Sequence, residues 1–372
     1  MSVRATPFHG RAAEANPRNA WTLRNGYTLG LDYGDANDEA LAARTRVAFG
    51  DISWRWRVAF EGARAAEFLS RLATRDASKL EPGKSLKALW LTDNGAVRGA
   101  GLIARYGRET FRLVAAAPDR DWIMNAAQRF GLAAREIAGE GGLSILGPYA
   151  RALIQSAGIA ADLEPLDFKK LFWRGLDITL SRWGEFGGYE IWCNADDAIV
   201  VWDRIVKAGA AFAIAPMGLA AMDVLDIEAG IARPLRDWQP AEDGFGSTPT
   251  PSELGLESLI AEDHPTFNGR AAFLAAAKAP RTIAGIEIGA DMPAPFTPLT
   301  RNGVTVGHTM SSAWSPALRR AIALARLDRS AAEPGTALAL NLPPSREVPE
   351  WRNASARVVP LPFLPAPDSL PP

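Results

Sequence analysis

The sequence predicts an α+β protein that ends in a separate β-rich domain, and three observations support this. The chain has 372 residues, 48% of them hydrophobic and 22% charged, which is enough apolar material for two or three globular domains. Helical and strand periodicities alternate through most of the chain. Beyond about residue 275, short β-prone segments alternate with proline and glycine, as is typical of small all-β units.

The first clear elements are a strand followed by a helix. Residues 54–60 (WRWRVAF) alternate apolar residues with arginine, which indicates a half-buried strand. Residues 62–73 (GARAAEFLSRLA) predict a helix with a single apolar stripe. The stripe consists of Ala65, Phe68, Leu69 and Leu72, at positions i, i+3, i+4 and i+7.

The segment around residue 100 matches a dinucleotide-binding motif but is predicted to be a β-hairpin. Residues 99–104 read GAGLIA and match G-x-G-x-x-A. That motif works only where a helix begins directly after the glycines, because the helix N-terminus binds the pyrophosphate. Here Gly107 interrupts the run, and residues 108–117 (RETFRLVAAA) continue as a strand. Asp93-Asn94-Gly95 is a strong signal for the first hairpin turn.

A second helix is expected after residues 194–197 (NADD), whose side chains can cap a helix N-terminus. It carries Val201, Trp202 and Ile205 toward the core and is expected to end at Gly209. The β-prone segments of the C-terminal domain are RTIAGIEIG (281–289), GVTVGHTM (303–310), TALALNLP (336–343) and ARVVPLPFL (356–364). The proline-rich tail, 366–372, is expected to be flexible.

Composition excludes several classes of function. With 41 Lys+Arg and 42 Asp+Glu the net charge is −1, which argues against a nucleic-acid-binding protein. The single cysteine, Cys193, excludes a disulfide framework, and three histidines far apart in the sequence predict no metal site. No apolar run reaches the ~18 residues needed to span a membrane, and the first residues lack a secretory signal, so a cytoplasmic protein is expected. The composition is unusual in its 12 tryptophans.

Short blocks along nearly the whole chain resemble the glycine-cleavage T-protein (aminomethyltransferase) superfamily. The blocks include FGDIS (49–53), SILGPYA (144–150), RWGEFGGYEIW (182–192), APMGLAAMDVLDIEAGI (215–231) and GHTMSSAWSPAL (307–318). In character the chain is nearest to the tetrahydrofolate-dependent demethylases of that superfamily. The resemblance implies a folate-binding body of two interleaved α+β domains and a C-terminal β-barrel. The implied domains are a discontinuous folate-binding domain (1–50 and 140–272), an inserted α+β domain (51–139) and the barrel (273–365).

The same resemblance implies the residues that bind tetrahydrofolate. Glu190 matches the glutamate that pairs with the pterin ring, and one carboxylate can accept from two parallel N–H donors. Trp183 stands where the family usually has a tyrosine near the folate, and Leu102 is a third contact. The alternatives are a solvated strand glutamate at Glu190 and core packing at Leu102.

Two departures from the family pattern concern the reaction centre. The aspartate of the family's N-G-G-x-x-D-D block falls on Ala100 and its neighbour on Gly99, so the block lacks its carboxylates. The two arginines of a second block fall on Met222 and Asp226. A role in glycine cleavage is therefore not expected. The demethylase branch also does without that aspartate, so an active enzyme is still predicted.

The altered centre suggests how a substrate is held. Arg98 lies beside the lost carboxylates and is predicted to pair with a substrate carboxylate or phenolate; the alternative is an exposed hairpin arginine. Trp54, Trp56 and Trp90 are predicted to form aromatic walls, with core packing as the alternative. By strand alternation, Trp54 and Trp56 are expected on one face and the neighbouring arginines on the other.

Together these features predict a tetrahydrofolate-dependent methyltransferase or demethylase. Its methyl donor is a small molecule, and the tryptophans favour an aromatic acid. A phenolate leaving group, with a pKa of about 10, benefits from a proton donor, for which Tyr106, Tyr189 and bound water are candidates. The alternatives are a folate-binding protein without transfer activity and a folate-independent enzyme that reuses the pocket.

Overall fold

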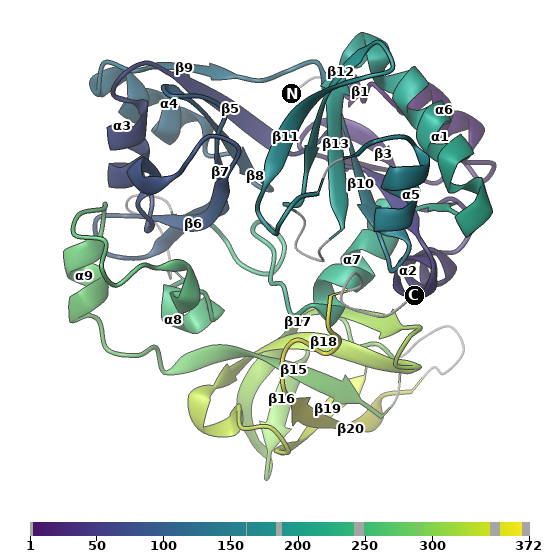
Figure 1. Cartoon of the computed structure of the whole chain (residues 1–372). Coiled ribbons are helices and arrows are strands. Elements are labelled where there is room, and N and C mark those ends of the chain that lie inside the picture. Colours follow the sequence, from purple (N-terminus) through teal and green to yellow (C-terminus); the bar gives the residue numbers. More distant parts are fainter. Residues whose placement is uncertain are drawn as a thin grey trace.

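We describe a computed structural model of the chain, covering residues 3–160, 162–183, 188–241, 249–289, 291–342 and 350–366. The structure is of the predicted α+β class and consists of two β-sheets that face each other, a small third sheet and a closed barrel (Figure 1). Residues 184–187 of the block around Trp183, and residues 367–372 of the expected tail, lie outside the described residues. No helix in the described part of the chain is long and apolar enough to cross a membrane.

The six-stranded sheet combines strands that come before and after the five-stranded sheet in the sequence. Its order is β11 (Phe168–Trp173), β12 (Leu176–Ser181), β13 (Tyr189–Asn194), β10 (Glu140–Leu146), β4 (Ala48–Asp51) and β14 (Ala215–Pro216). The five-stranded sheet has the order β6 (Ser85–Leu91), β7 (Val97–Arg105), β8 (Thr110–Ala115), β5 (Trp56–Glu61) and β9 (Ala133–Glu136). The chain thus leaves the first sheet after β4 and returns to it at β10.

The remaining strands form the third sheet and the barrel. The third sheet has the order β1 (Arg4–Ala5), β3 (Tyr27–Gly30) and β2 (Trp21–Arg24). The barrel closes in the order β15 (Arg281–Ile288), β18 (Arg320–Asp328), β17 (Val304–Ser315), β16 (Pro298–Arg301), β19 (Ala337–Leu342) and β20 (Arg352–Val359). The four predicted C-terminal segments are strands of this barrel. Two barrel strands were not predicted. Strand β16 has only four residues, and β18 is an alanine-rich strand that is buried along most of its length and shows no alternation.

The α-helices flank the two large sheets or lie between these sheets and the barrel (Figure 1). They are α1 (His9–Glu14), α2 (Ala36–Thr45), α3 (Ala65–Leu72), α4 (Arg120–Arg129), α5 (Ala150–Ser156), α6 (Ala198–Gly209), α7 (Leu219–Glu228), α8 (Pro251–Leu254) and α9 (Arg270–Ala275). In Figure 1, α7 lies between the six-stranded sheet and the barrel, and it contacts α2, β17 and β18.

Most of the local predictions are confirmed. Helix α3 buries its predicted stripe, and β6 and β7 form the predicted hairpin, so residues 99–104 lie within a strand. Helix α6 buries Val201, Trp202 and Ile205 and ends at Gly209. The predicted cap is wrong. Residues 195–197 form a 3-10 turn, and neither Asn194 nor Asp197 makes a side-chain cap hydrogen bond.

The residues after α7 pack against the five-stranded sheet. Leu89, Leu91 and Val97 of the β6–β7 hairpin share one buried cluster with Trp238, Leu254, Ile260 and Phe267. Trp238 and the segment 254–267 are thus in contact with the sheet that the predicted inserted domain contains, although the prediction assigns them to the other domain. The domain boundaries themselves stay a prediction.

Candidate functional site

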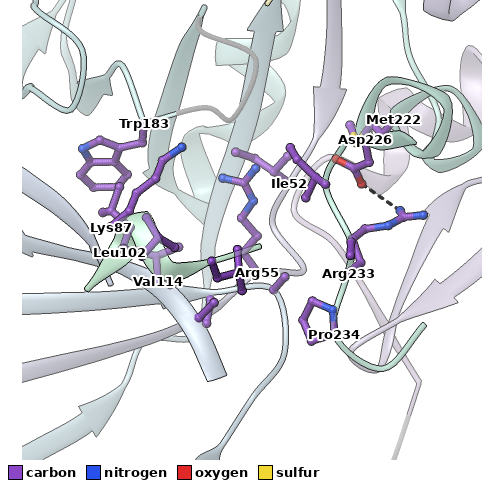
Figure 2. Close-up of a pocket in the computed structure, with 18 of the residues that line it drawn as sticks. Ile52, Arg55, Lys87, Leu102, Val114, Trp183, Met222, Asp226, Arg233 and Pro234 are labelled. Carbon is purple, nitrogen blue, oxygen red and sulfur yellow. Dashed lines mark ion pairs between the residues drawn. The ribbon is translucent and has the colours of Figure 1, made fainter. Parts of the chain in front are cut away.

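A cavity of about 420 Å³ lies between the two large sheets, α7 and the segment that follows α7 (Figure 2). This volume is within the ~300–1,000 Å³ typical of small-molecule sites. The β4–β5 loop contributes Ile52, Trp54 and Arg55 to its lining. The other lining residues that matter below are Arg24, Lys87, Ala100, Leu102, Val114, Trp183, Glu190, Met222, Asp226, Arg233, Pro234 and Trp238.

Glu190 is the buried carboxylate of this cavity. It is only 1% exposed and lies on β13, where β10 and β12 flank it on both sides. Its Oε1 accepts a hydrogen bond from Arg55 Nη1 at 2.6 Å, and its Oε2 accepts one from Trp192 Nε1 at 3.2 Å. A carboxylate has about four acceptor positions, so each oxygen retains capacity for another donor.

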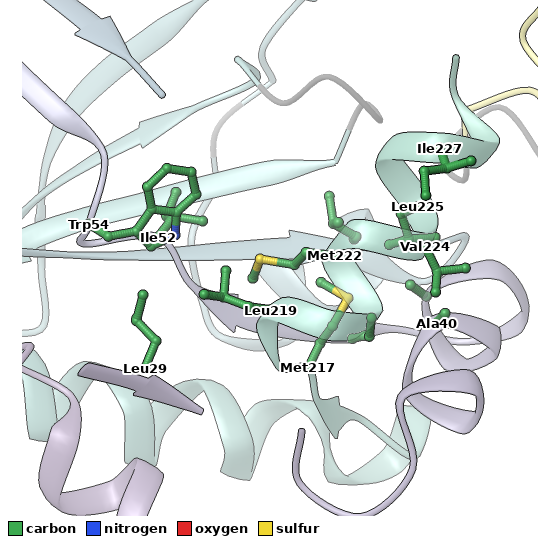
Figure 3. Packing of buried hydrophobic residues seen from close by; sticks show 14 of the residues in the cluster. Leu29, Ala40, Ile52, Trp54, Met217, Leu219, Met222, Val224, Leu225 and Ile227 are labelled. Atoms are coloured by element: carbon green, nitrogen blue, oxygen red, sulfur yellow. The ribbon is translucent and has the colours of Figure 1, made fainter. Parts of the chain in front are cut away.

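Among the residues that the structure describes, two indole N–H groups in the cavity wall have no hydrogen-bond acceptor. Trp183 and Trp54 are 5% and 7% exposed, and the Nε1 atom of each is buried without a partner. Buried donors normally have acceptors, so these two indicate positions where a bound molecule would place one. Figure 3 shows Trp54 together with Ile52, Leu219 and Met222, all members of one buried apolar cluster. Leu102 belongs to the same cluster and lines the cavity.

The charged lining residues are mostly basic. Arg24, Arg55, Lys87 and Arg233 are cationic, whereas Glu190 and Asp226 are the acidic lining residues among those described. Arg55 is 24% exposed and pairs with Glu190. Lys87 lies opposite Leu102 in the β6–β7 pairing, and Figure 2 shows it near Trp183. The cavity therefore suits a ligand that carries or develops negative charge.

Arg233 belongs to a network of charges behind the cavity wall. It contacts Asp223 and lies 2.9 Å from Asp226 Oδ2. Burial acts to raise the pKa of Asp223, but the charges of Arg233, Arg236 and Arg24 outweigh burial and hold that pKa below its ordinary value. Burial lowers the pKa of Arg24, whose guanidinium also lies 4.9 Å from the centre of the Trp54 ring. The network fixes the arginines in place rather than leaving them to solvent.

Trp56 and Trp90 are not among the described residues that line this cavity, so the structure does not bring them to the predicted aromatic walls. Strand β5 begins at Trp56, and Trp54 lies in the preceding loop, where strand alternation does not apply. Trp56 packs in the core of the five-stranded sheet, with its Nε1 2.5 Å from Glu136. The Trp90 ring takes the space beside Gly99, where an added Cβ would lie 2.2 Å from it.

Arg98 is also placed away from the cavity. Its Nε and Nη2 atoms donate to Asp119 at 2.6 and 2.9 Å, and its guanidinium lies over the Trp122 ring. A register shift in the β6–β7 pairing leaves Arg98 between the paired residues Val97 and Gly99, so it does not follow the alternation of Ala100 and Leu102. The structure therefore does not bring Arg98 to this cavity, and its substrate contact stays a prediction.

Neither tyrosine candidate for the proton donor lines the cavity. Tyr189 precedes Glu190 on β13 and packs in the cluster on the opposite face of the sheet. The Tyr106 ring contacts Phe168 at 4.4 Å between centroids, and Phe168 in turn contacts Trp183 at 5.2 Å. Burial raises the pKa of Tyr106. Tyr106 thus supports the Trp183 side of the cavity from behind.

Sequence analysis did not assign Arg55, Lys87, Arg233 or Trp238 to the site. The alternation of residues 54–60 predicted that the tryptophans face the site and that Arg55 lies on the opposite face. Lys87 had a detectable signal, because it is the one charged residue of β6, in which five of the other six residues are apolar. Arg233 and Trp238 follow α7 in an irregular segment, where periodicity gives no information.

Comparison with known proteins identifies the family. The model described as "GCVT N-terminal domain" matches residues 9–263, and "Glycine cleavage T-protein C-terminal barrel domain" matches residues 281–364. The chain belongs to the glycine cleavage T-protein (GCVT) family. As the resemblance implied, the second match coincides with the observed barrel.

Named members of this family include aminomethyltransferases. The chain is 29% identical over 248 residues to the aminomethyltransferase of Pseudothermotoga lettingae, which covers 64% of this chain and 66% of that protein. It is 29% identical over 279 residues to the aminomethyltransferase of Halalkalibacterium halodurans, covering 71% and 73%. The crystal structure of the glycine cleavage system aminomethyltransferase T from Bartonella henselae superimposes with a TM-score of 0.84 at 23% identity, over 98% of this chain and 99% of that one. This last match establishes the GCVT-like fold.

Proposed function

We propose that this GCVT-family protein binds tetrahydrofolate in the cavity and moves a methyl group to it from a small methoxy-aromatic compound. The observation that carries the proposal is Glu190, a buried carboxylate that faces a ligand-sized cavity and has one protein donor on each oxygen. Neighbouring N–H groups of a pterin ring are suitable donors for the remaining acceptor positions.

The residues present fit tetrahydrofolate. Glu190 would hold the pterin edge, Trp183 offers an aromatic surface and an N–H donor without an acceptor, and Leu102 adds apolar contact. When bound, tetrahydrofolate supplies the N5 amine that accepts a methyl group. The protein contributes binding and orientation, because holding two reactants in line removes much of the entropic barrier to their reaction.

The other half of the cavity suits a flat, acidic methyl donor. Trp54 and Trp238 supply aromatic surface, and Ile52 and Val114 supply apolar surface. The basic lining favours a carboxylate or a developing phenolate. Ala100 lines the cavity and brings no carboxylate that would repel such a donor.

Calorimetric titration of tetrahydrofolate into the protein, followed by incubation with a panel of methoxybenzoic acids and sulfonium compounds, tests the proposal. We expect binding and the appearance of 5-methyltetrahydrofolate with at least one methoxybenzoic acid. Binding without transfer from any donor would identify a folate-binding protein instead, which the missing carboxylate at Ala100 favours as the second candidate. Absence of binding would contradict both and leave a folate-independent enzyme.

A further inference from the structure

We propose that Lys87 is a catalytic residue that donates a proton to the leaving oxygen of the methyl donor. This inference rests on the proposed function and adds a catalytic residue to it. The role applies to methyl ethers, whose leaving group becomes an oxyanion, and not to sulfonium compounds, whose leaving group is neutral.

The first argument is which lining groups can release a proton. Arginine stays protonated in proteins, so Arg24, Arg55 and Arg233 can stabilise an anion but cannot act as acids. Glu190 and Asp226 each pair with an arginine, where a carboxylate serves as an acceptor. Among the described lining residues, Lys87 is the one cation able to transfer a proton.

The second argument is position. Lys87 lies on β6 directly opposite Leu102 of β7, and both side chains line the cavity. Figure 2 shows Lys87 extending toward Trp183, with Arg55 across the same region of the view. Tyr106 and Tyr189 are absent from the described cavity lining, which leaves Lys87 and bound water as candidate donors, and the variants below distinguish between them. A lysine ammonium placed in the cavity can donate a proton to a leaving aryl oxygen, as general acid catalysis requires.

The third argument is charge selection between donors. A sulfonium is cationic in the ground state, and a lining with four basic and two acidic residues repels it. A methyl ether is neutral at the start and places negative charge on oxygen as the bond breaks, which the same lining stabilises.

The step balances as follows. The oxygen–methyl bond breaks and its electron pair remains on the aryl oxygen, while the methyl carbon bonds to the lone pair of the acceptor amine, N5 of the proposed tetrahydrofolate. Lys87 gives one Nζ proton to the aryl oxygen, so the products are a phenol and a neutral lysine amine. The proton that N5 loses on methylation restores the ammonium through solvent.

Lys87→Gln and Lys87→Arg test the inference, with Lys79→Gln as the matched control, since the Lys79 side chain is 65% exposed and contacts Asp263 outside the cavity. The probes are methoxybenzoic acids whose ring substituents vary the acidity of the product phenol, together with a dimethylsulfonium carboxylate. We expect Lys87→Gln to lose about 10²–10⁴-fold in transfer rate from ethers of weakly acidic phenols and much less from nitro-substituted ethers. Lys87→Arg should fail to restore the rate, and the wild-type loss of rate at alkaline pH should disappear in Lys87→Gln.

Three results would overturn the inference: an equal loss for all ethers, full activity of Lys87→Arg, or wild-type turnover of the sulfonium in preference to the ethers. The first two of these leave methyl transfer from the ethers to tetrahydrofolate intact, so they separate this inference from the proposed function. A wild-type protein that does not bind tetrahydrofolate overturns both.

Discussion

Glu190 and Glu228 are both buried, and each pairs with an arginine, but their surroundings differ. Glu228, at the end of α7, pairs with Arg44 in a contact where the two side chains are 0% and 3% exposed. Its Oε1 accepts a hydrogen bond from Ser315 of the barrel at 2.6 Å. Arg44 also donates to the carbonyl of Pro365, so this pair joins α2, α7, the barrel and the C-terminal segment.

Glu190 faces a cavity, and its arginine partner, Arg55, is 24% exposed. The comparison shows that burial and an arginine partner do not by themselves separate a structural carboxylate from a binding one. The difference lies in what surrounds the pair: protein on every side at Glu228, and at Glu190 a space that a ligand can fill. A substitution at Glu228 should therefore lower stability, whereas a substitution at Glu190 should lower ligand affinity.

The largest expected effect is at Glu228. Replacing Glu228 by Ala leaves the Arg44 charge buried and unpaired, which typically costs about 3–5 kcal/mol of unfolding free energy. Urea denaturation followed by tryptophan fluorescence measures it. The double variant Arg44→Met with Glu228→Leu should recover most of the loss, since an apolar pair of similar size removes the uncompensated charge. A loss below about 1 kcal/mol in the single variant would contradict the structural assignment.

At Glu190 we expect a smaller effect, and we expect it on tetrahydrofolate affinity rather than on stability. Glu190→Gln removes charged hydrogen bonds worth about 1.5–3 kcal/mol to a bound pterin, so tetrahydrofolate affinity should fall roughly 10–100-fold in a calorimetric titration. The unfolding free energy should change by less than about 1 kcal/mol, because Arg55 can be solvated. Glu136→Gln is the matched control, since Glu136 pairs with Arg120 outside the cavity. Equal affinity of wild type and Glu190→Gln would remove the pterin role.

Much of the fold, and less of the site, could be predicted from the sequence. Elements with a single period, such as α3 and the β6–β7 hairpin, are local, and the C-terminal strands were separated by proline and glycine. Glu190 and Trp183 were identified through motif resemblance, and both line the cavity. These are cases in which short-range pattern and final position agree.

The sequence-based expectations for the site differ from the structure where tertiary contacts override strand alternation. The register shift beside Trp90 turns Arg98 toward Asp119, and no sequence rule gave the position of that shift. Trp90 lies over Gly99 and Gly101 of the neighbouring strand, where an added side chain would meet the indole ring. Arg233 enters the site through an ion-pair network with α7, which involves residues that are not periodic.

A third buried carboxylate, Asp51, extends the comparison to pH. It accepts hydrogen bonds from Thr6 Oγ1 at 2.6 Å and from the Ser53 amide at 2.9 Å, and burial raises its pKa above the ordinary value. A raised pKa means that the folded state binds the proton more tightly. The contribution of Asp51 to stability is therefore complete below the unfolded pKa of about 3.9 and falls as pH rises toward the folded pKa, by at most about 1.4 kcal/mol per pH unit.

Asp51→Asn should remove that slope. The difference in unfolding free energy between the variant and wild type, measured by urea denaturation at several pH values from acidic to neutral, should shift in favour of the variant as pH rises. A difference that is constant with pH would show that Asp51 titrates alike in the folded and unfolded chains.

The smallest expected effects come from removing one hydrogen-bond donor from each of the two glutamates, Glu190 and Glu228. Trp192→Phe removes the N–H that donates to Glu190 Oε2 but keeps a ring beneath Arg57, whose guanidinium lies 4.0 Å from the Trp192 ring centre. One hydrogen bond is worth about 1 kcal/mol, so we expect roughly fivefold weaker binding of tetrahydrofolate. Ser315→Ala removes the corresponding donor to Glu228 Oε1 and should lower the unfolding free energy by a similar amount while leaving affinity unchanged. If both variants changed stability alone, Glu190 would be as structural as Glu228, and the cavity would lose its proposed anchor for the pterin.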